Sequence, residues 1–149
     1  MSSFRQKRGI VTFWLTWPGI WIVLRFSQRT RIRITAENKV LVVKSWLGNG
    51  KWNLPGGGIK SNESALTAVI REVKEETGLT ITEKQLTRTE KRMYKSSGLR
   101  FQYLEFTMEL AKIVDVVPQI GELSDIAWVE VGSLNIRNAN YDVLMALKS

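Results

Sequence analysis

The stretch GGIKSNESALTAVIREVKEETGL, residues 57–79, contains the clearest helix signal in this chain. Apolar residues recur at three- and four-residue spacing at positions 65, 66, 69, 70 and 73, which predicts a helix with one face against a sheet. Gly78 stands where a left-handed C-cap usually ends a helix. We therefore predict a helix over residues 62–77.

Three carboxylates cluster near the end of this helix. Glu72, Glu75 and Glu76 are separated by three, one and four residues, so they lie on one side of a single turn. Like charges at this spacing destabilise a helix by about 0.2–0.5 kcal/mol per pair, and the helix dipole disfavours negative charge at its C-terminal end. A bound divalent cation would remove this cost, and Arg71 is placed to pair with Glu75.

A run of glycines, Gly56-Gly57-Gly58, precedes the helix. Glycine has no Cβ and tolerates unusual dihedral angles, so the backbone here can approach a bound ion or phosphate closely. Taken separately, however, glycines usually make turns and Glu-rich helices are usually solvated faces. A functional interpretation therefore depends on the glycine run and the carboxylate helix occurring together.

Composition restricts the chemistry available. The chain has 149 residues, about one domain, with no cysteine and no histidine. Disulfides, thiolate catalysis and cysteine zinc sites are therefore excluded, together with the commonest general base. Carboxylates as the anionic ligands favour a hard cation such as Mg²⁺ or Mn²⁺.

The glycine run and the carboxylate helix together resemble the Nudix box, a spaced pattern that is specific because it fixes many positions. Every fixed position is filled, by Gly57, Glu63, Arg71-Glu72-Val73, Glu75-Glu76 and Gly78-Leu79. The preceding Leu54-Pro55-Gly56 also resembles family members. The resemblance is strong over the box and looser over residues 29–149.

The resemblance implies an α/β/α sandwich with a mixed sheet, in which the box forms a loop, a helix and a loop. It implies metal-binding or catalytic roles for Glu72, Glu75 and Glu76, and a backbone carbonyl ligand from Gly56. The residues implied to support the box structurally are Gly57, Glu63, Arg71 and Gly78. Family members often use a further Glu from outside the box, for which we choose Glu122, with Glu105 and Asp125 as weaker candidates.

The implied activity is Mg²⁺-dependent hydrolysis, with Mn²⁺ as an alternative, of a diphosphate bond in a nucleotide-type substrate. Metal ions would neutralise the phosphate oxygens and acidify a water that attacks phosphorus in line. The proton acceptor is left open between Glu72, Glu122 and another carboxylate. The alternative from another class is a catalytically silent Nudix domain that binds nucleotides or regulates a partner, although the intact box argues against it.

The remaining pattern is that of an α/β domain over residues 29–149. We predict strands at residues 30–35, 40–43, 87–94, 99–110 and 126–131, and a closing helix at 141–147. In the first strand Arg31 and Arg33 alternate with Ile32 and Ile34, which indicates one wet face. This order of elements predicts a mixed sheet covered by helices.

The N-terminal segment, residues 1–28, differs from the rest. The net charge of +8 is concentrated at this end, because residues 1–34 hold seven basic residues and no acidic one. Residues 9–24 carry no charge but include three Trp and a Pro-Gly break, which is too short for a spanning helix of roughly 20 apolar residues. Contact with an anionic membrane surface and packing on the domain, or on a second subunit in a homodimer, are equally weighted. We expect a cytoplasmic protein, with peripheral membrane association as the variant.

The substrate is not determined by the box. No downstream motif matches those that we associate with NADH, coenzyme A, ADP-ribose or dinucleoside polyphosphate members. Aromatic candidates for stacking a base, which are more often core residues, are Trp46, Trp52, Tyr94, Phe101 and Tyr103. Basic candidates for phosphate contact, which are more often solvated, are Lys44, Lys51, Arg92, Lys95 and Arg100.

Overall fold

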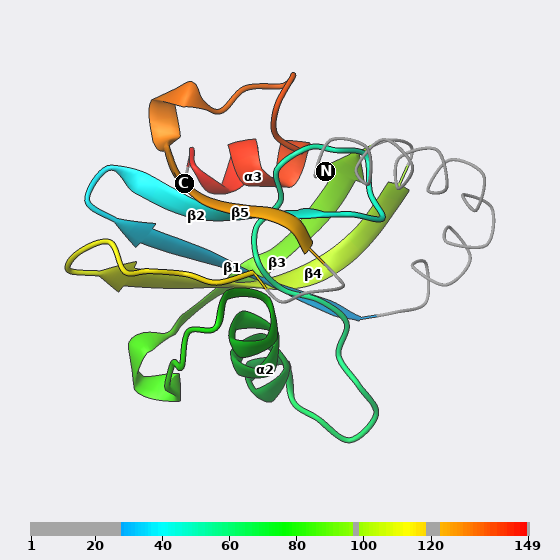
Figure 1. Cartoon of the computed structure of the whole chain (residues 1–149). Coiled ribbons are helices and arrows are strands. Elements are labelled where there is room, and N and C mark those ends of the chain that lie inside the picture. Colours follow the sequence, from blue (N-terminus) through cyan, green and yellow to red (C-terminus); the bar gives the residue numbers. More distant parts are fainter. Residues whose placement is uncertain (1–27, 97–98, 119–122, 149) are drawn as a thin grey trace.

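A five-stranded mixed sheet forms the centre of the molecule (Figure 1). The computed structural model describes residues 28–96, 99–118 and 123–148. The strands are β1 (Arg29–Ala36), β2 (Lys39–Ser45), β3 (Thr87–Ser96), β4 (Leu99–Leu110) and β5 (Leu123–Glu130), in the spatial order β3-β4-β1-β2-β5. β1 runs parallel to β4, whereas the other neighbours are antiparallel. The predicted mixed sheet is confirmed.

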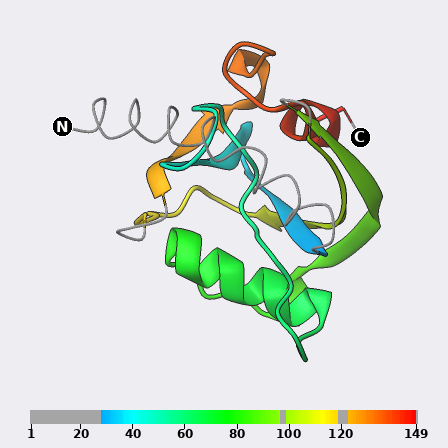
Figure 2. The same cartoon turned by 90° about the vertical axis from the view of Figure 1, so that its right-hand side faces the viewer.

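Helices cover both faces of the sheet. Helix α2 (Ala65–Thr77) lies on one face and the short helix α3 (Tyr141–Ala146) on the other, as Figures 1 and 2 show from two directions. Two 3₁₀ turns, Glu83–Gln85 and Val131–Ser133, were not foreseen from the sequence. The expected α/β/α sandwich is confirmed.

The two helices define two hydrophobic cores. Under α2, Val69 and Val73 pack with Ile32, Ile34 and Phe106, and all five side chains are buried. The predicted apolar stripe of α2 is therefore the face that meets the sheet. Under α3, Val143 and Ala146 pack with Val40, Val42 and Leu54. The alternation of side chains along β2 supplies both cores, because Leu41 faces α2 while its neighbours face α3.

Helix α2 begins three residues later than predicted. Ser64 is the N-cap, and its hydroxyl accepts a hydrogen bond of 3.0 Å from the Thr67 amide. Asn62 has a left-handed φ of 66° and cannot belong to the helix. The predicted end is correct, since Gly78 adopts a φ of 77° and its amide donates to the Lys74 carbonyl at 3.0 Å.

The predicted alternation along β1 is confirmed, since Ile32 and Ile34 are buried and the arginines between them are partly exposed. The exposure of Arg31 and Arg33 is limited because α3 covers their side of the sheet. Arg33 Nη1 donates to the Ala146 carbonyl at 2.5 Å, at the end of α3. A polar strand face is therefore half-buried here and forms defined contacts.

Strand β5 also differs from its predicted bounds. It begins at Leu123, three residues before the predicted start, and ends at Glu130. Its first residues pair with the end of β2, with Leu123 opposite Ser45, after a register shift between Lys44 and Ser45. Pairing with β2 extends this strand, and the intrinsic strand propensity of its own residues does not predict such pairing.

Some predictions concern residues outside the described ranges, namely the N-terminal segment up to residue 27 and Glu122. Within the part of the chain that the structure describes, no helix is both long and apolar enough to cross a membrane.

Candidate functional site

The glycine loop runs beside β1 and is fixed to it by backbone hydrogen bonds. Thr30 N donates to Gly57 O, and Ile32 N donates to Pro55 O, both at 2.9 Å. Gly56 has a φ of 132°, and a Cβ on it would lie 2.4 Å from the Thr30 carbonyl oxygen. Only glycine fits this position. The loop therefore delivers its backbone to the end of α2 with little freedom.

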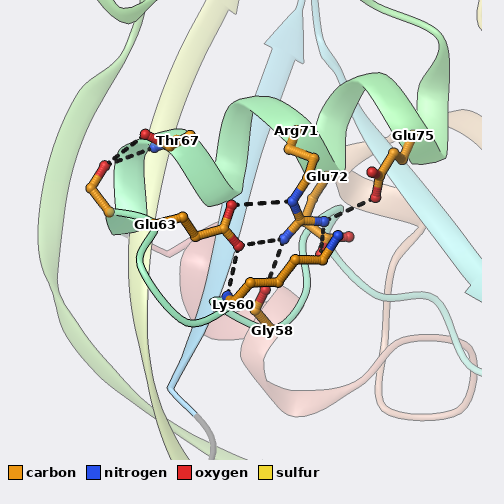
Figure 3. A network of polar contacts seen from close by, with 8 residues as sticks. Gly58, Lys60, Glu63, Thr67, Arg71, Glu72 and Glu75 are labelled. Atoms are coloured by element: carbon orange, nitrogen blue, oxygen red, sulfur yellow. Dashed lines mark hydrogen bonds and ion pairs between the residues drawn. The ribbon is translucent and has the colours of Figure 1, made fainter.

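Arg71 of α2 is the centre of a polar network (Figure 3). Its guanidinium donates to Glu63 at 2.7 and 3.2 Å, to Glu72 at 2.8 Å and to Glu75 at 2.9 Å. It also donates to the Gly58 carbonyl at 3.0 Å. These carboxylates, Glu63 above all, raise the pKa of Arg71. The predicted pairing of Arg71 with Glu75 is present, and Arg71 also binds the box loop to the helix.

Glu63 closes the loop in front of the helix. Its Oε1 accepts from the Lys60 amide at 2.7 Å as well as from Arg71. The hydrogen bond from Arg71, followed by that from Lys60, lowers the pKa of Glu63 from 4.5 to about 2. Glu63 is therefore ionised in the folded protein even in fairly acidic solution.

The lowered pKa of Glu63 makes stability depend on pH in a defined window. The unfolded chain takes up a proton near pH 4.5, whereas the folded protein does so only near pH 2. The stabilising contribution is therefore complete above pH 4.5 and is lost as pH falls toward 2. We expect the free energy of unfolding of the wild type to fall more steeply over this window than that of Glu63→Gln. Denaturant unfolding at successive pH values measures both slopes, and equal slopes would contradict the assignment.

The three box carboxylates do not point to one spot. Glu76 Oε2 accepts from the Gly56 amide at 2.8 Å. The Glu72 carboxylate lies so close to Gly57 that a Cβ on Gly57 would stand only 2.5 Å from it. Glu75 accepts from Arg71 Nη1 at 2.9 Å, the same atom that donates to Glu72, and its side chain is 44% exposed. Accordingly, the described residues contain no group of three acidic side chains placed to hold one ion.

The donors that do converge still fit Mg²⁺. Glu72, Glu76 and the Gly56 backbone offer oxygens, which are the ligands that a hard cation prefers. Mg²⁺ in proteins is commonly held by one or two carboxylates, with waters and substrate phosphates completing its octahedron. Two glutamates beside a glycine loop match that pattern, and Glu75 supports it through Arg71.

A cleft of about 280 Å³ opens beside these groups. One side is formed by Glu72, Glu76 and the glycine loop, while Arg29 and Arg31 of β1 contribute cations to the same cleft. The two arginines were not among the site residues predicted from the sequence. The signal in the sequence was the alternation of the two arginines with Thr30 and Ile32, which puts both arginines on one face of β1. This alternation does not indicate which other element lies near that face.

Most other residues considered from sequence lie elsewhere. Tyr103 is buried, Lys44 Nζ lies 4.0 Å from the centroid of the Trp52 ring, and Trp46 is 41% exposed. Lys51 Nζ donates to the Ile136 carbonyl at 2.7 Å. Side chains outside the described set are those of Arg92, Tyr94, Lys95, Arg100 and Phe101.

The candidates for a further carboxylate ligand from outside the box differ in burial and position. Glu105 is fully buried in β4, whereas Asp125 is exposed and its Oδ1 accepts from the Ile126 amide at 3.0 Å. Neither lines the cleft. Glu122, the preferred choice, lies outside the described residues.

The neighbouring glycines 57 and 58 provide a matched test of the loop. A Cβ on Gly57 would displace the Glu72 carboxylate, which Arg71 holds in place, whereas a Cβ on Gly58 meets nothing within 4 Å. We expect Gly57→Ala to weaken Mn²⁺ binding by about tenfold, since it displaces a candidate ligand, and Gly58→Ala to leave it unchanged. Titration followed by electron paramagnetic resonance measures both. Equal Mn²⁺ affinities of the two variants would show that Glu72 is not a ligand of the metal.

The comparison with known families decides the identity of the fold. A sequence model described as the NUDIX domain matches residues 26–147. This chain belongs to the Nudix family. The match spans most of the chain and includes both walls of the cleft, so the resemblance expected from the box is confirmed.

Two curated relatives show how far similarity to this Nudix chain extends. Phosphatase NudJ of Escherichia coli K12 is 33% identical over 100 residues, which cover 64% of this chain and 63% of NudJ. Nudix hydrolase 10 of Arabidopsis thaliana is 35% identical over 72 residues, which cover 47% of this chain and 26% of that protein. The matched part thus spans less than two thirds of either relative.

Solved structures support the Nudix fold. The MutT NUDIX hydrolase from Burkholderia pseudomallei superposes with a TM-score of 0.69 at 19% identity, covering 82% of this chain and 95% of that one. The Ap4A hydrolase of C. elegans, solved as a binary complex, gives 0.64 at 23% identity, covering 81% and 91%. At these identities the similarity concerns the fold alone.

Proposed function

We propose that this Nudix domain hydrolyses a phosphoanhydride bond of a nucleoside di- or triphosphate derivative with the aid of Mg²⁺ or Mn²⁺. The observation that supports this most is that one cleft is lined by both carboxylates and arginines. Glu72 and Glu76 line it beside the glycine loop. Arg29 and Arg31 of β1 line the same cleft. Carboxylates suit a divalent cation and arginines suit phosphate oxygens.

In the proposed reaction the chain holds and orients the reactants. Glu72 and Glu76 would hold the ion, together with the Gly56 carbonyl, which also accepts a hydrogen bond from Arg31 Nη1. The ion would supply Lewis-acid neutralisation of the phosphate and a more acidic water. Arg71 fixes Glu72 through its 2.8 Å hydrogen bond, and the Gly56 amide fixes Glu76 at 2.8 Å. The proton released by the attacking water would pass to a carboxylate of the site, because the chain has no histidine.

The substrate class is supported by size and charge. A cleft of about 280 Å³ accommodates a short phosphate chain more readily than a whole nucleotide. A nucleoside moiety would therefore extend beyond it. The exposed Trp46 directly follows Ser45, which lines the cleft, and offers a stacking surface at its margin.

A panel of nucleotides tests the proposal. Phosphate or pyrophosphate release with Mg²⁺ is measured for nucleoside triphosphates, nucleoside diphosphate sugars, ADP-ribose and dinucleoside polyphosphates, with EDTA as the control. Cation-dependent turnover of at least one compound is expected. Binding of nucleotides without turnover of any would favour the silent binding module.

The N-terminal segment supports a separate proposal about location. Residues 1–28 combine Trp with flanking cations, a composition suited to an anionic membrane surface. Sedimentation with vesicles containing phosphatidylserine, using the full chain and a chain that lacks residues 1–28, tests this. Equal partitioning would favour packing on the domain or on a second subunit, which analytical ultracentrifugation distinguishes.

A further inference from the structure

The cleft has an uncharged side as well as a charged one. The lining residues without charge, apart from the glycine loop, are Val43, Ser45, Asn53 and Leu123. Val43 pairs with Asn53 in an isolated bridge. Ser45 lies two residues further along β2 and is the register partner of Leu123. These residues therefore lie together, on the side of the cleft that adjoins the exposed Trp46.

Asn53 belongs to a closed cycle of hydrogen bonds with two other asparagines. The Lys51 amide donates to Asn49 Oδ1 at 3.1 Å, and Asn49 Nδ2 donates to Asn140 Oδ1 at 2.8 Å. Asn140 Nδ2 donates to Asn53 Oδ1 at 2.5 Å, and Asn53 Nδ2 donates to the Lys51 carbonyl at 3.2 Å. This asparagine cycle thus begins and ends on the backbone of Lys51.

The backbone of Lys51 fixes the direction of the asparagine cycle. A backbone N–H can only donate, whereas an asparagine side chain can turn to present either its oxygen or its nitrogen. Because Lys51 donates to Asn49, each following amide has one orientation that completes the cycle. Asn140 is 2% exposed, which makes an unmade hydrogen bond there costly. The orientation of the Asn53 amide is therefore determined before a ligand binds.

The asparagine cycle uses only half of the Asn53 amide. One N–H and one lone pair remain outside the cycle, because a side-chain amide has two N–H groups and an oxygen with two lone pairs. The bond that the oxygen accepts from Asn140, at 2.5 Å, is much shorter than the 3.2 Å bond that the nitrogen donates. Hydrogen bonds in a chain polarise one another, and the shorter bond has the larger effect. It strengthens the remaining N–H as a donor and weakens the remaining lone pair as an acceptor.

We propose that the remaining N–H of Asn53 donates to a carbonyl oxygen on the nucleobase of the substrate. The site would then prefer a base with an oxygen at position 6 of a purine or position 4 of a pyrimidine, where other bases carry an amino group. An amino group would place one donor against another and leave the N–H without an acceptor. Asn49 and Asn140 are positioning residues that act through Asn53. The inference rests on the proposed function for the presence of a nucleotide in the cleft.

Pairs of nucleotides that differ at this position test the preference. ITP and ATP carry an oxygen and an amino group at position 6, and UTP and CTP carry them at position 4. Binding to the full chain is measured by NMR titration in EDTA, which prevents metal-dependent hydrolysis. We expect the wild type to bind the oxo member of at least one pair about fivefold more tightly than the amino member. Equal Kd values in both pairs, a preference for the amino members, or binding of none of the four would overturn the proposal.

Asn49→Asp tests the asparagine cycle without altering a residue that lines the cleft. The aspartate can still accept from the Lys51 amide, but it has no N–H to donate to Asn140. Asn140 must then turn its nitrogen toward residue 49 and its oxygen toward Asn53, and the Asn53 amide must turn in response. The preference for the oxo member should therefore be lost. Asn49 is half-buried, so the added charge stays in contact with water.

Asn135→Asp is the matched control. Asn135 Oδ1 accepts from the Arg137 amide at 2.9 Å, two residues further along the chain, as Asn49 Oδ1 does from the Lys51 amide. The substitution adds the same charge outside the asparagine cycle, so the ratio of the two Kd values should not change. An unchanged ratio in Asn49→Asp as well would overturn the positioning role of the cycle.

The ratio of the Kd values also separates recognition from a purely structural role. A structural role would weaken binding of both members equally, whereas recognition changes their ratio. Asn53→Asp, which removes both N–H groups, should abolish the preference even if Asn49→Asp fails to fold. A wild-type ratio in Asn53→Asp would overturn the whole proposal.

The outcome is distinguishable from failure of the proposed function. Preferential binding of the oxo member, without turnover of any nucleotide in the panel, would retain this inference and reject the hydrolase. Turnover with equal Kd and equal kcat/KM for both members of each pair would retain the hydrolase and reject this inference.

Discussion

Glu76→Gln is expected to lower metal-dependent turnover by about a hundredfold or more while leaving the fold intact. The Glu76 carboxylate has two roles in the cleft. One oxygen accepts from the Gly56 amide at 2.8 Å, and the negative charge is available to a cation. Glutamine retains an amide oxygen for the first role and removes the charge required for the second. The loss should therefore appear in catalysis and metal affinity, with little change in Tm.

The measurement is initial rate against Mg²⁺ concentration for the best substrate of the panel, together with Mn²⁺ affinity by electron paramagnetic resonance. Glu109→Gln is the matched control, because Glu109 is an exposed glutamate on β4 away from the cleft. Near-wild-type turnover in Glu76→Gln would reject the metal site as described. Equal losses in both variants would indicate a nonspecific effect of charge.

Arg71→Met is expected to have the largest effect on stability, lowering Tm by about 5–10 °C. The substitution removes the donor shared by Glu63, Glu72 and Glu75, and it also frees the Gly58 carbonyl. Three carboxylates would then repel one another without a compensating charge. Mg²⁺ should therefore raise Tm more in the variant than in the wild type, since the cation supplies part of the missing charge.

Differential scanning calorimetry with and without Mg²⁺ checks both parts. Lys74→Met is the control, because Lys74 is an exposed cation on the same helix and takes no part in the network. A Tm within 2 °C of the wild type for Arg71→Met would show that the network contributes little. Destabilisation without any added effect of Mg²⁺ would place the cation elsewhere.

Elements whose signals are local were predicted closely. Helix α2 ends at Gly78 as expected, because a glycine in the left-handed region is a property of one residue and its immediate neighbours. The bounds predicted for β4, residues 99–110, match the structure. Errors arose where pairing decided the outcome, as at the start of β5, which is set by the register of β2 rather than by its own residues.

The residues of the candidate site also differ in how far local sequence predicted them. The clustering of Glu72 and Glu76 follows from their spacing, since four residues make about one turn of any helix. Their expected role at a metal came from the resemblance to the Nudix box. The position of Glu75 was only partly foreseen, because the distribution of three carboxylates around Arg71 depends on where the glycine loop and Glu63 lie. Arg29 and Arg31 were missed, since nothing along β1 indicates that it borders a cleft shared with α2.

The sequence by itself therefore determined the family, the mixed sheet with its two covering helices, and the clustering of three carboxylates on one turn of α2. These follow from residue type and spacing within one helix or strand. Only the tertiary structure placed Arg31 in the cleft and Glu105 beside it in the sheet, because the register of β1 with β4 pairs these two residues. They are more than 70 positions apart in the chain, and only the parallel pairing of the two strands brings them together.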